Sequence, residues 1–206
     1  MIAAAYAAQY GFGGGSPAQV AAQLGLIPRE LWNGGRSGLF TYIFLNAGLV
    51  QAALAVGMTL VLATPFSRRL PGVTGFFALL SFFLLCGAAG GLMFAALSPA
   101  SGDVLIGSSA AVSGLLAAAA RTAGGRRGVA PLTSPLLLAI GAVWLVANAA
   151  AAFTDVMGRS VFSEYGWQAH IGGFLAGALL VGPWTRLFGE RRPPFASTPD
   201  PRDPHA

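Results

Sequence analysis

The chain has 206 residues, of which 55% are hydrophobic and only 9% are charged. A soluble domain carries about 25% charged residues, so this composition excludes an ordinary soluble domain and indicates a membrane protein. The net charge of +5 comes entirely from arginine, since the chain contains no lysine. A basic chain can bind nucleic acid, but these arginines stand between long apolar runs, and we expect the lipid bilayer rather than nucleic acid as the partner.

The first apolar stretch, from Ile2 to Tyr10, is too short to cross a bilayer. The sequence GFGGGSP at 11–17 ends any helix there. A helix over the preceding residues is about 14 Å long, roughly half the hydrocarbon thickness. We interpret it as a stub, or as a first span truncated at its start. A signal peptide is an alternative, but the positively charged n-region is missing. We expect the following residues, from Gly11 to Gly38, to lie against the outer leaflet.

Five long runs without Asp, Glu, Lys or Arg follow. About 20 apolar residues cross a bilayer as a helix. We therefore expect an all-α polytopic bundle with five full transmembrane helices, at about 40–64, 73–97, 107–120, 133–153 and 167–187, besides the N-terminal stub. Residues 1–188 then form one transmembrane domain. Residues 189–206, rich in proline and arginine, are expected to be a disordered cytoplasmic tail.

Arginines follow the first, third and fifth of these runs, so alternate loops are basic. The positive-inside rule places such loops in the cytoplasm. We expect the loops at 65–72 and 121–131 and the C-terminus to be cytoplasmic, and the loops at 98–106 and 154–166 to face outward. The protein is then an integral, multi-pass protein, and we expect it in a bacterial inner membrane.

The third run, GSSAAVSGLLAA at 107–118, begins with serines although its far end is apolar. A helix from Ser109 to Ala120 rises about 18 Å, against a hydrocarbon core of about 30 Å. Ser109 is therefore expected roughly 10 Å below the outer surface, reached by an irregular segment. Non-helical backbone survives at that depth only if it is buried in protein or lines a water-filled cavity. The serines are thus predicted at a buried helix N-terminus that faces a cavity.

The fifth run contains WQAHIGGFLAG, in which His170 is the only histidine outside the C-terminal tail. Gly173 and Gly177 lie on the same helical face as this histidine and form a GxxxG, which allows a second helix to approach closely. The third run offers a matching row of small residues: Gly107, Ala111, Gly114 and Ala118. Packing of these two faces is expected to bring Ser109 and His170 together.

A histidine inside the membrane is costly, which makes a functional role the default. Imidazole can take the hydroxyl proton as serine attacks a carbonyl, and amides at a helix N-terminus can stabilise the oxyanion. The alternative is structural: a transmembrane serine usually bonds back to a carbonyl, as we expect for Ser113. The residues alone leave a nucleophile and base pair and a structural role both open.

At these residues the sequence resembles the rhomboid intramembrane serine proteases. GSSA at 107–110 corresponds to the family's GxSG, and AHIGGFLAG at 169–177 to its AHxxG with a following GxxxG. The segment at 25–50 is similar to the family's membrane-lying first loop, and the resemblance covers roughly residues 25–187. It implies Ser109 as nucleophile and His170 as base in a dyad without a carboxylate. It also implies transmembrane protein substrates, with no metal or cofactor.

The sequence departs from the family where the oxyanion site is expected. The family's second span usually reads HxxxN, whereas this chain has Gln51 and Ala55. The glycine after the nucleophile is replaced by Ala110. The candidate oxyanion residues are Gln51, Asn46 and Ser108. The alternative to a protease is therefore a rhomboid-like protein that binds transmembrane helices without cutting them. A small-solute transporter has little support, since the chain shows no internal repeat and His170 is its only candidate relay residue.

Cysteine-accessibility mapping tests the expected topology. In a chain whose native Cys86 is replaced by alanine, we expect Asp103→Cys to react with a membrane-impermeant thiol reagent from outside. Arg126→Cys should react only after the membrane is opened, because its loop is basic. Labelling of both positions from the same side contradicts this topology.

Overall fold

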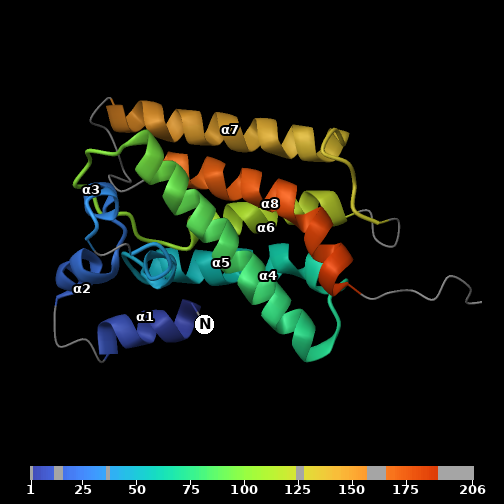
Figure 1. Ribbon diagram of the computed structural model, residues 1–206, viewed down its shortest axis with the longest axis horizontal. Helices are drawn as coiled ribbons and strands as arrows, with labels where there is room; N and C mark the ends of the chain where they lie inside the picture. Colours follow the sequence, from blue (N-terminus) through green and yellow to red (C-terminus); the bar gives the residue numbers. More distant parts are fainter. Residues whose placement is uncertain (1, 12–15, 36–37, 124–127, 157–165, 190–206) are drawn as a thin grey trace, which may run out of the picture.

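The computed structural model is an all-α bundle (Figure 1) and describes residues 2–11, 16–35, 38–123, 128–156 and 166–189. Within these ranges it contains eight α-helices and a short 3₁₀ helix. In chain order they are α1 (Ile2–Gly11), α2 (Pro17–Leu24), α3 (Pro28–Trp32), η1 (Tyr42–Phe44), α4 (Leu49–Ser67), α5 (Gly72–Leu97), α6 (Ser109–Thr122), α7 (Pro135–Val156) and α8 (Trp167–Phe188). The tail expected at 189–206 lies, apart from its first residue, outside the described residues.

Four of the described helices, α4, α5, α7 and α8, are long and apolar enough to cross a membrane. The expectation of five full spans is therefore wrong: one of the five expected helices is too short to cross the membrane. The helix in question is α6, which has 14 residues and is about 21 Å long. Its first residue is Ser109, so the preceding segment reaches into the bundle without helical structure. The expected stub is present as α1, which has 10 residues.

The expected start of the second span is also wrong. We placed it near residue 40, but α4 begins at Leu49. The apolar residues before it form η1, in which Tyr42 and Ile43 are buried in the protein rather than exposed to lipid. The helix starts after Gly48, where the side-chain Oε1 of Gln51 accepts a hydrogen bond of 2.6 Å from the Ala47 amide. A side chain in the first turn thus fixes where this span begins.

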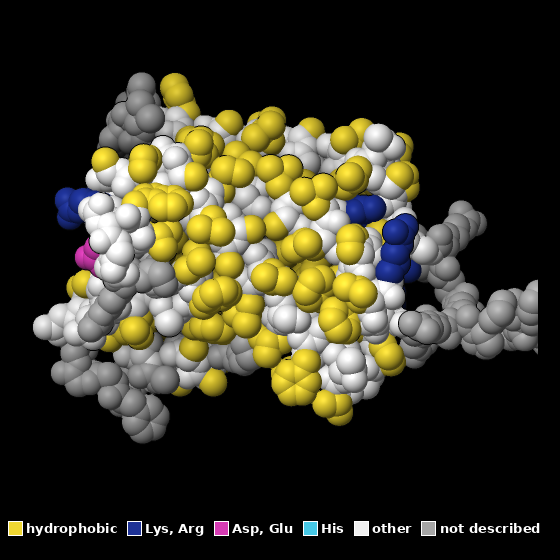
Figure 2. Space-filling view, in the orientation of Figure 1, with side chains coloured by type: hydrophobic (Ala, Val, Ile, Leu, Met, Phe, Trp, Pro, Cys, Tyr) yellow, Lys and Arg dark blue, Asp and Glu magenta, His cyan; other side chains and the backbone are white. Residues whose placement is uncertain are grey.

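Large apolar side chains are exposed along the long helices rather than along α6. They include Leu54 and Val61 on α4, Phe77 on α5 and Val143 on α7. On the face in Figure 2, hydrophobic side chains cover the middle of the molecule and the charged side chains lie at its two ends. Lipid is the solvent in which such a belt is stable, since exposed apolar surface of this extent is unfavourable in water.

Helix α6 lies in the centre of the bundle, and most of its residues are buried. It packs closely against α8 through glycine: a Cβ on Gly173 would overlap the carbonyl oxygen of Ala110, and one on Gly177 would overlap that of Gly114. Small residues that let backbones approach are the usual basis of helix packing in membranes. The expected close packing therefore involves Gly114, Gly173 and Gly177.

Gly107 does not belong to this packing row, contrary to our expectation. It lies before the start of α6, and its φ of +115° is a backbone conformation that favours glycine. The chain turns at this residue into the helix. Gly107 therefore serves the backbone turn that precedes Ser109, rather than a contact between helices.

Arginine side chains connect neighbouring segments by hydrogen bonds at the end of the bundle where α6 terminates. Arg121 Nε donates to the Ala130 carbonyl at 2.7 Å, and its Nη1 donates to the Ala178 carbonyl on α8. Arg69 Nη2 donates to the Thr122 carbonyl at 3.0 Å. The loop after α4, the end of α6 and the end of α8 lie at the same end in Figure 1, as expected for the loops assigned to the cytoplasm.

A pair of glycine substitutions tests the packing of α6 on α8. Gly177→Ala should destabilise the protein by about 1–3 kcal/mol, because its methyl group meets the Gly114 backbone and cannot be accommodated without moving a helix. Gly57→Ala on α4 is the matched control, since a Cβ there has no atom within 4 Å. Thermal unfolding in detergent should show a lower midpoint only for Gly177→Ala. Equal midpoints for the two variants contradict this packing.

Candidate active site

Ser109 and His170 meet where α6 begins. Ser109 Oγ lies 2.8 Å from His170 Nε2, within hydrogen-bond distance. The histidine is 4% exposed, whereas Ser109, the first residue of its helix, is exposed. Ser109 therefore lies at the surface of the protein while the imidazole is held inside it. This is the arrangement that a serine nucleophile and its general base require.

The start of α6 also supplies backbone donors beside the serine. Ser108 is the N-cap residue, and its carbonyl accepts the hydrogen bond from Val112 at 2.9 Å. The N–H groups in the first turn of a helix have no partner within the helix, because the carbonyl four residues earlier does not belong to it. The Ser109 N–H is one of these amides. Such groups can stabilise negative charge that develops next to the serine hydroxyl.

Gln51 lies at the edge of this site. Because its Oε1 is bonded to the Ala47 amide, its Nε2 is directed away from that contact. A Cβ on Gly107 would lie 3.0 Å from Gln51 Nε2 and 3.8 Å from Ser109 Oγ. The amide nitrogen and the hydroxyl thus both lie beside Gly107, which has no side chain to occupy the space next to them. Of the three oxyanion candidates, Gln51 is the one whose donor the structure brings toward Ser109.

The other two candidates have different surroundings. Asn46 is fully buried and exchanges hydrogen bonds of 3.1 Å with Gln9 on α1 through its backbone N–H and carbonyl. These bonds hold α1 against the segment before α4. The Ser108 hydroxyl is buried and has no hydrogen-bond partner among the described residues. Ala55, one turn after Gln51, packs against the apolar core and offers no donor.

Ala110, which replaces the family's glycine after the nucleophile, fits because a glycine faces it. Ala110 is 1% exposed. A Cβ on Gly90 of α5 would lie 2.6 Å from the Ala110 Cβ, which is closer than packed carbon atoms approach. The lack of a side chain at Gly90 therefore provides the room for the Ala110 methyl group.

The irregular segment that leads to Ser109 has its backbone bonded within the protein, as we expected. Leu105 and Leu26 exchange backbone hydrogen bonds of 2.9 and 3.0 Å, and Gly107 N–H donates to the Tyr42 carbonyl at 2.9 Å. Backbone groups in a membrane need such internal partners. The segment at 25–46 thus supports the approach to the nucleophile.

Two aromatic side chains anchor that supporting segment on α5. The Tyr42 hydroxyl donates to the Gly87 carbonyl at 2.7 Å, and Trp32 Nε1 donates to the Ala95 carbonyl at 2.9 Å. Burial raises the pKa of the Tyr42 phenol, so the hydroxyl stays protonated and remains a donor. The position of Gly107 is therefore tied to α5 through Tyr42.

Asn148 is a site residue that the sequence analysis missed. Its Oδ1 lies 2.8 Å from His170 Nδ1, and its Nδ2 donates to the Trp144 carbonyl at 2.8 Å. Asn148 is 1% exposed. Its signal in the sequence was an isolated amide in the apolar run of α7. The ring of Trp144 also lies beside His170, with the two ring centroids 6.0 Å apart.

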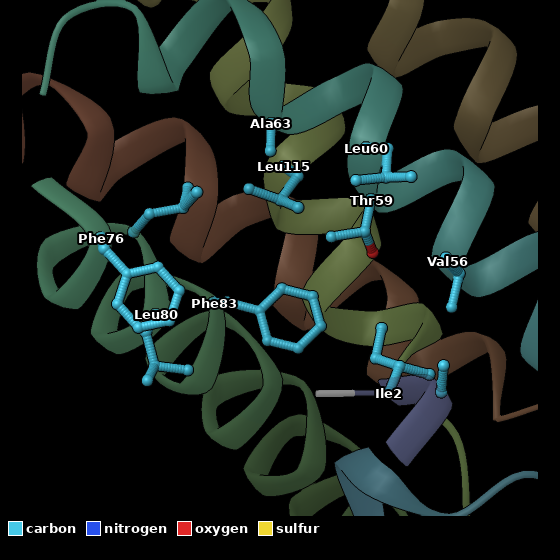
Figure 3. Close-up of a pocket in the computed structure, with 11 residues that line it drawn as sticks. Ile2, Val56, Thr59, Leu60, Ala63, Phe76, Leu80, Phe83 and Leu115 are labelled. Carbon is cyan, nitrogen blue, oxygen red and sulfur yellow. The ribbon is translucent and has the colours of Figure 1, made fainter. Parts of the chain in front are cut away.

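An apolar cavity of about 210 Å³ lies elsewhere, between α4 and α5 next to the start of α1 (Figure 3). Ile2, Phe83 and Leu115 are among the residues that line it, and Thr59 carries its one side-chain hydroxyl. None of its lining residues is titratable, so we assign no chemistry to it. Among the described residues, no three His, Cys, Asp or Glu side chains come together to hold a metal ion.

The helices and the site together define a multi-pass integral membrane protein with a serine and a histidine hydrogen-bonded inside its helical bundle. Comparison with known protein families matches residues 28–186 to the Rhomboid domain. This chain belongs to the rhomboid family. The match covers most of the chain and nearly the same residues as the resemblance seen in the sequence. No curated protein and no solved structure matches the chain.

Labelling with a fluorophosphonate tests which serine is the nucleophile. Ser109→Ala should abolish labelling, because it removes the hydroxyl that is bonded to the imidazole. Ser108→Ala and Ser113→Ala should label nearly as well as the wild type, since Ser108 is buried and Ser113 donates to the Ser109 carbonyl at 2.8 Å. Labelling of Ser109→Ala together with its loss in Ser108→Ala contradicts this assignment.

Proposed function

We propose that the protein is an intramembrane serine endopeptidase that cleaves transmembrane protein substrates in a bacterial inner membrane. The observation that carries this proposal is the 2.8 Å contact between Ser109 Oγ and His170 Nε2. Membership of the rhomboid family supports the same activity. The proposed chemistry uses only groups of this chain and water.

In the proposed reaction Ser109 Oγ attacks the carbonyl carbon of the scissile peptide bond while His170 Nε2 takes the hydroxyl proton. The carbonyl oxygen becomes the oxyanion of a tetrahedral intermediate. This intermediate collapses when the C–N bond breaks and His170 returns the proton to the leaving amine. Water then attacks the acyl-serine with His170 again as the base, which releases the acid product and restores the Ser109 hydroxyl.

The oxyanion of this reaction is stabilised by the Ser109 backbone N–H and the Gln51 side-chain amide. The first is an unbonded amide at a helix N-terminus. The second lies on the other side of the space left open at Gly107. Both donors are neutral and fixed by the fold, so little reorganisation is needed when the charge develops.

A second candidate function is favoured by one observation, the absence of a donor at Ala55. A rhomboid-like protein without a competent oxyanion site would bind transmembrane helices and leave them intact. The two functions differ in what the site does to a bound carbonyl, so both labelling and cleavage are needed to separate them. A fluorophosphonate supplies its own leaving group, and its reaction depends less on the oxyanion site than peptide cleavage does.

Three substitutions on α4 test the oxyanion site. Gln51→Ala should reduce cleavage of a model transmembrane substrate by about 10²- to 10³-fold, the usual effect of removing one such donor. Gln51→Glu should be as slow or slower, although it retains the acceptor for the Ala47 amide, because it loses the N–H donor and adds a negative charge. Ala55→Asn should raise cleavage. Initial rates are compared in the same lipid at equal amounts of folded protein.

Gln51→Glu separates the oxyanion role from helix capping, because it keeps the oxygen that accepts from the Ala47 amide and loses the N–H donor. Ser109→Ala provides the background rate. If both Gln51 variants cut as fast as the wild type and Ala55→Asn is no faster, these positions do not form the oxyanion site. If the folded wild type neither labels nor cuts, the binding function without cleavage is correct.

A further inference from the structure

A chain of hydrogen bonds at the site crosses three helices. It joins Ser109 on α6 to His170 Nε2 on α8, and His170 Nδ1 to Asn148 Oδ1 on α7, with 2.8 Å at each contact. His170 and Asn148 are 4% and 1% exposed, so water has little access to the second contact. Helix α7 therefore contributes a side chain to the site, in addition to the two helices that carry the serine and the histidine.

The orientation of the Asn148 amide follows from its other partner. Nδ2 lies 2.8 Å from the carbonyl oxygen of Trp144, one turn earlier on the same helix. A backbone carbonyl can only accept a hydrogen bond, so the NH₂ group must face it. Turning the amide over would place Oδ1 against the Trp144 oxygen, with two acceptors in contact. The acceptor Oδ1 is thereby directed at His170.

This orientation determines which nitrogen of His170 carries the proton. A neutral imidazole has one N–H donor and one nitrogen that accepts. Because Asn148 Oδ1 only accepts, Nδ1 must be the protonated nitrogen. Nε2 then keeps its lone pair and accepts the hydrogen of the Ser109 hydroxyl. The other tautomer would place an N–H against the serine and could not act as its base.

We propose that Asn148 is a positioning residue of the site, which holds His170 in the tautomer and ring orientation that Ser109 needs. This inference rests on the proposed proteolytic function and extends the serine–histidine dyad by a third residue. Asn148 acts through His170, and nothing in the geometry requires it to contact the substrate. The structure thus assigns it the orienting role that a buried carboxylate has in soluble serine proteases.

An amide suits this position better than a carboxylate would. A charged side chain buried in a membrane protein is costly unless it is paired. Asn148 offers the same acceptor to Nδ1 without a charge, and its donor is used by the Trp144 carbonyl. Asn148 thus makes both hydrogen bonds, to the Trp144 carbonyl and to His170 Nδ1, without placing a charge in the bundle.

Kinetics of three α7 variants test the role. Asn148→Leu has the same branched shape but no acceptor, and kcat should fall roughly 10²-fold with KM nearly unchanged. Complete loss of the correct tautomer in a soluble serine protease costs about 10⁴-fold. Asn148→Asp should retain most of the activity, because one oxygen still faces Nδ1 and the other, kept protonated by burial, donates to the Trp144 carbonyl in place of Nδ2. Ala149→Leu, an exposed neighbour on the same helix, is the matched control and should behave as the wild type.

The tautomer itself is measured by ¹⁵N NMR of histidine-labelled protein. The chain has two histidines, so the labelled protein carries His205→Gln and the signals belong to His170. We expect a protonated Nδ1 and an unprotonated Nε2 in the wild type and in Asn148→Asp. In Asn148→Leu the signals should shift toward the other tautomer or a mixture of both. If the leucine variant does not fold, Asn148→Ala replaces it with the same expectations.

The two measurements separate a positioning role from a structural one. A folded Asn148→Leu or Asn148→Ala that keeps the single Nδ1–H tautomer overturns the proposal, even if its activity is lost. A changed tautomer with an unchanged kcat overturns it as well. The NMR measurement is made on the resting protein and needs no turnover. A wild type that never cleaves therefore refutes the proposed function, while the tautomer still decides whether Asn148 orients His170.

Discussion

The close approach of α6 to α8 is the contact on which the site depends. Gly173 and Gly177 lie directly against the backbone carbonyls of Ala110 and Gly114 on α6. In lipid, apolar side chains gain little by leaving their surroundings, so such close backbone packing is a main source of helix association. The same contact sets the separation between Ser109 and His170, and a hydrogen bond of 2.8 Å has little tolerance for a shift of either helix. The packing of the bundle and the geometry of the candidate site therefore depend on the same glycine interface.

The shortness of α6 is the second constraint, and it gives the site its access. A helix of 14 residues leaves part of the bilayer thickness to be crossed by irregular backbone, which lipid cannot solvate. Backbone groups of Leu26 and Tyr42 supply the missing partners through hydrogen bonds to Leu105 and Gly107. Because α6 starts inside the bundle, the amides at its N-terminus that have no helical acceptor lie next to Ser109, which is exposed. The short α6 leaves irregular backbone that the protein must satisfy, but it also supplies the amide donors that the proposed acyl transfer requires.

Much of this arrangement was predictable from the sequence because its signals are local. The apolar runs gave α5, α7 and α8 to within a few residues, and the glycine spacing after His170 indicated its packing partner. Residues 40–48 were misread because an apolar stretch that packs against protein has the same composition as one that faces lipid; only the burial of Tyr42 and Ile43 separates them. The role of Gly107 depends on a positive φ, which spacing does not report.

Asn148 could not be placed from the sequence for a different reason. Its partner His170 is 22 residues away on another helix, and which face of α7 meets that histidine is decided by the packing of the whole bundle. The orienting role that we propose for it therefore follows only from the amide, the Trp144 carbonyl and the imidazole considered together.

The described polar groups at the site, namely Ser109, His170, Asn148 and Gln51, carry no permanent charge when the imidazole is neutral. In the proposed reaction, proton transfer to His170 creates an imidazolium and an oxyanion together, so the charges arise as a nearby pair rather than as isolated ions. In a poorly polarisable surrounding that pair needs fixed dipoles for its stabilisation. Asn148 can offer the imidazolium only a dipole, where a carboxylate would offer a full charge. The oxyanion side of the pair must then contribute more, and in this chain it has lost the donor at Ala55. The rate of the proposed reaction then depends mainly on the donors that remain, the Ser109 amide and Gln51. On this proposal the first turn of α4 is as important to the chemistry as the helices that carry the serine and the histidine.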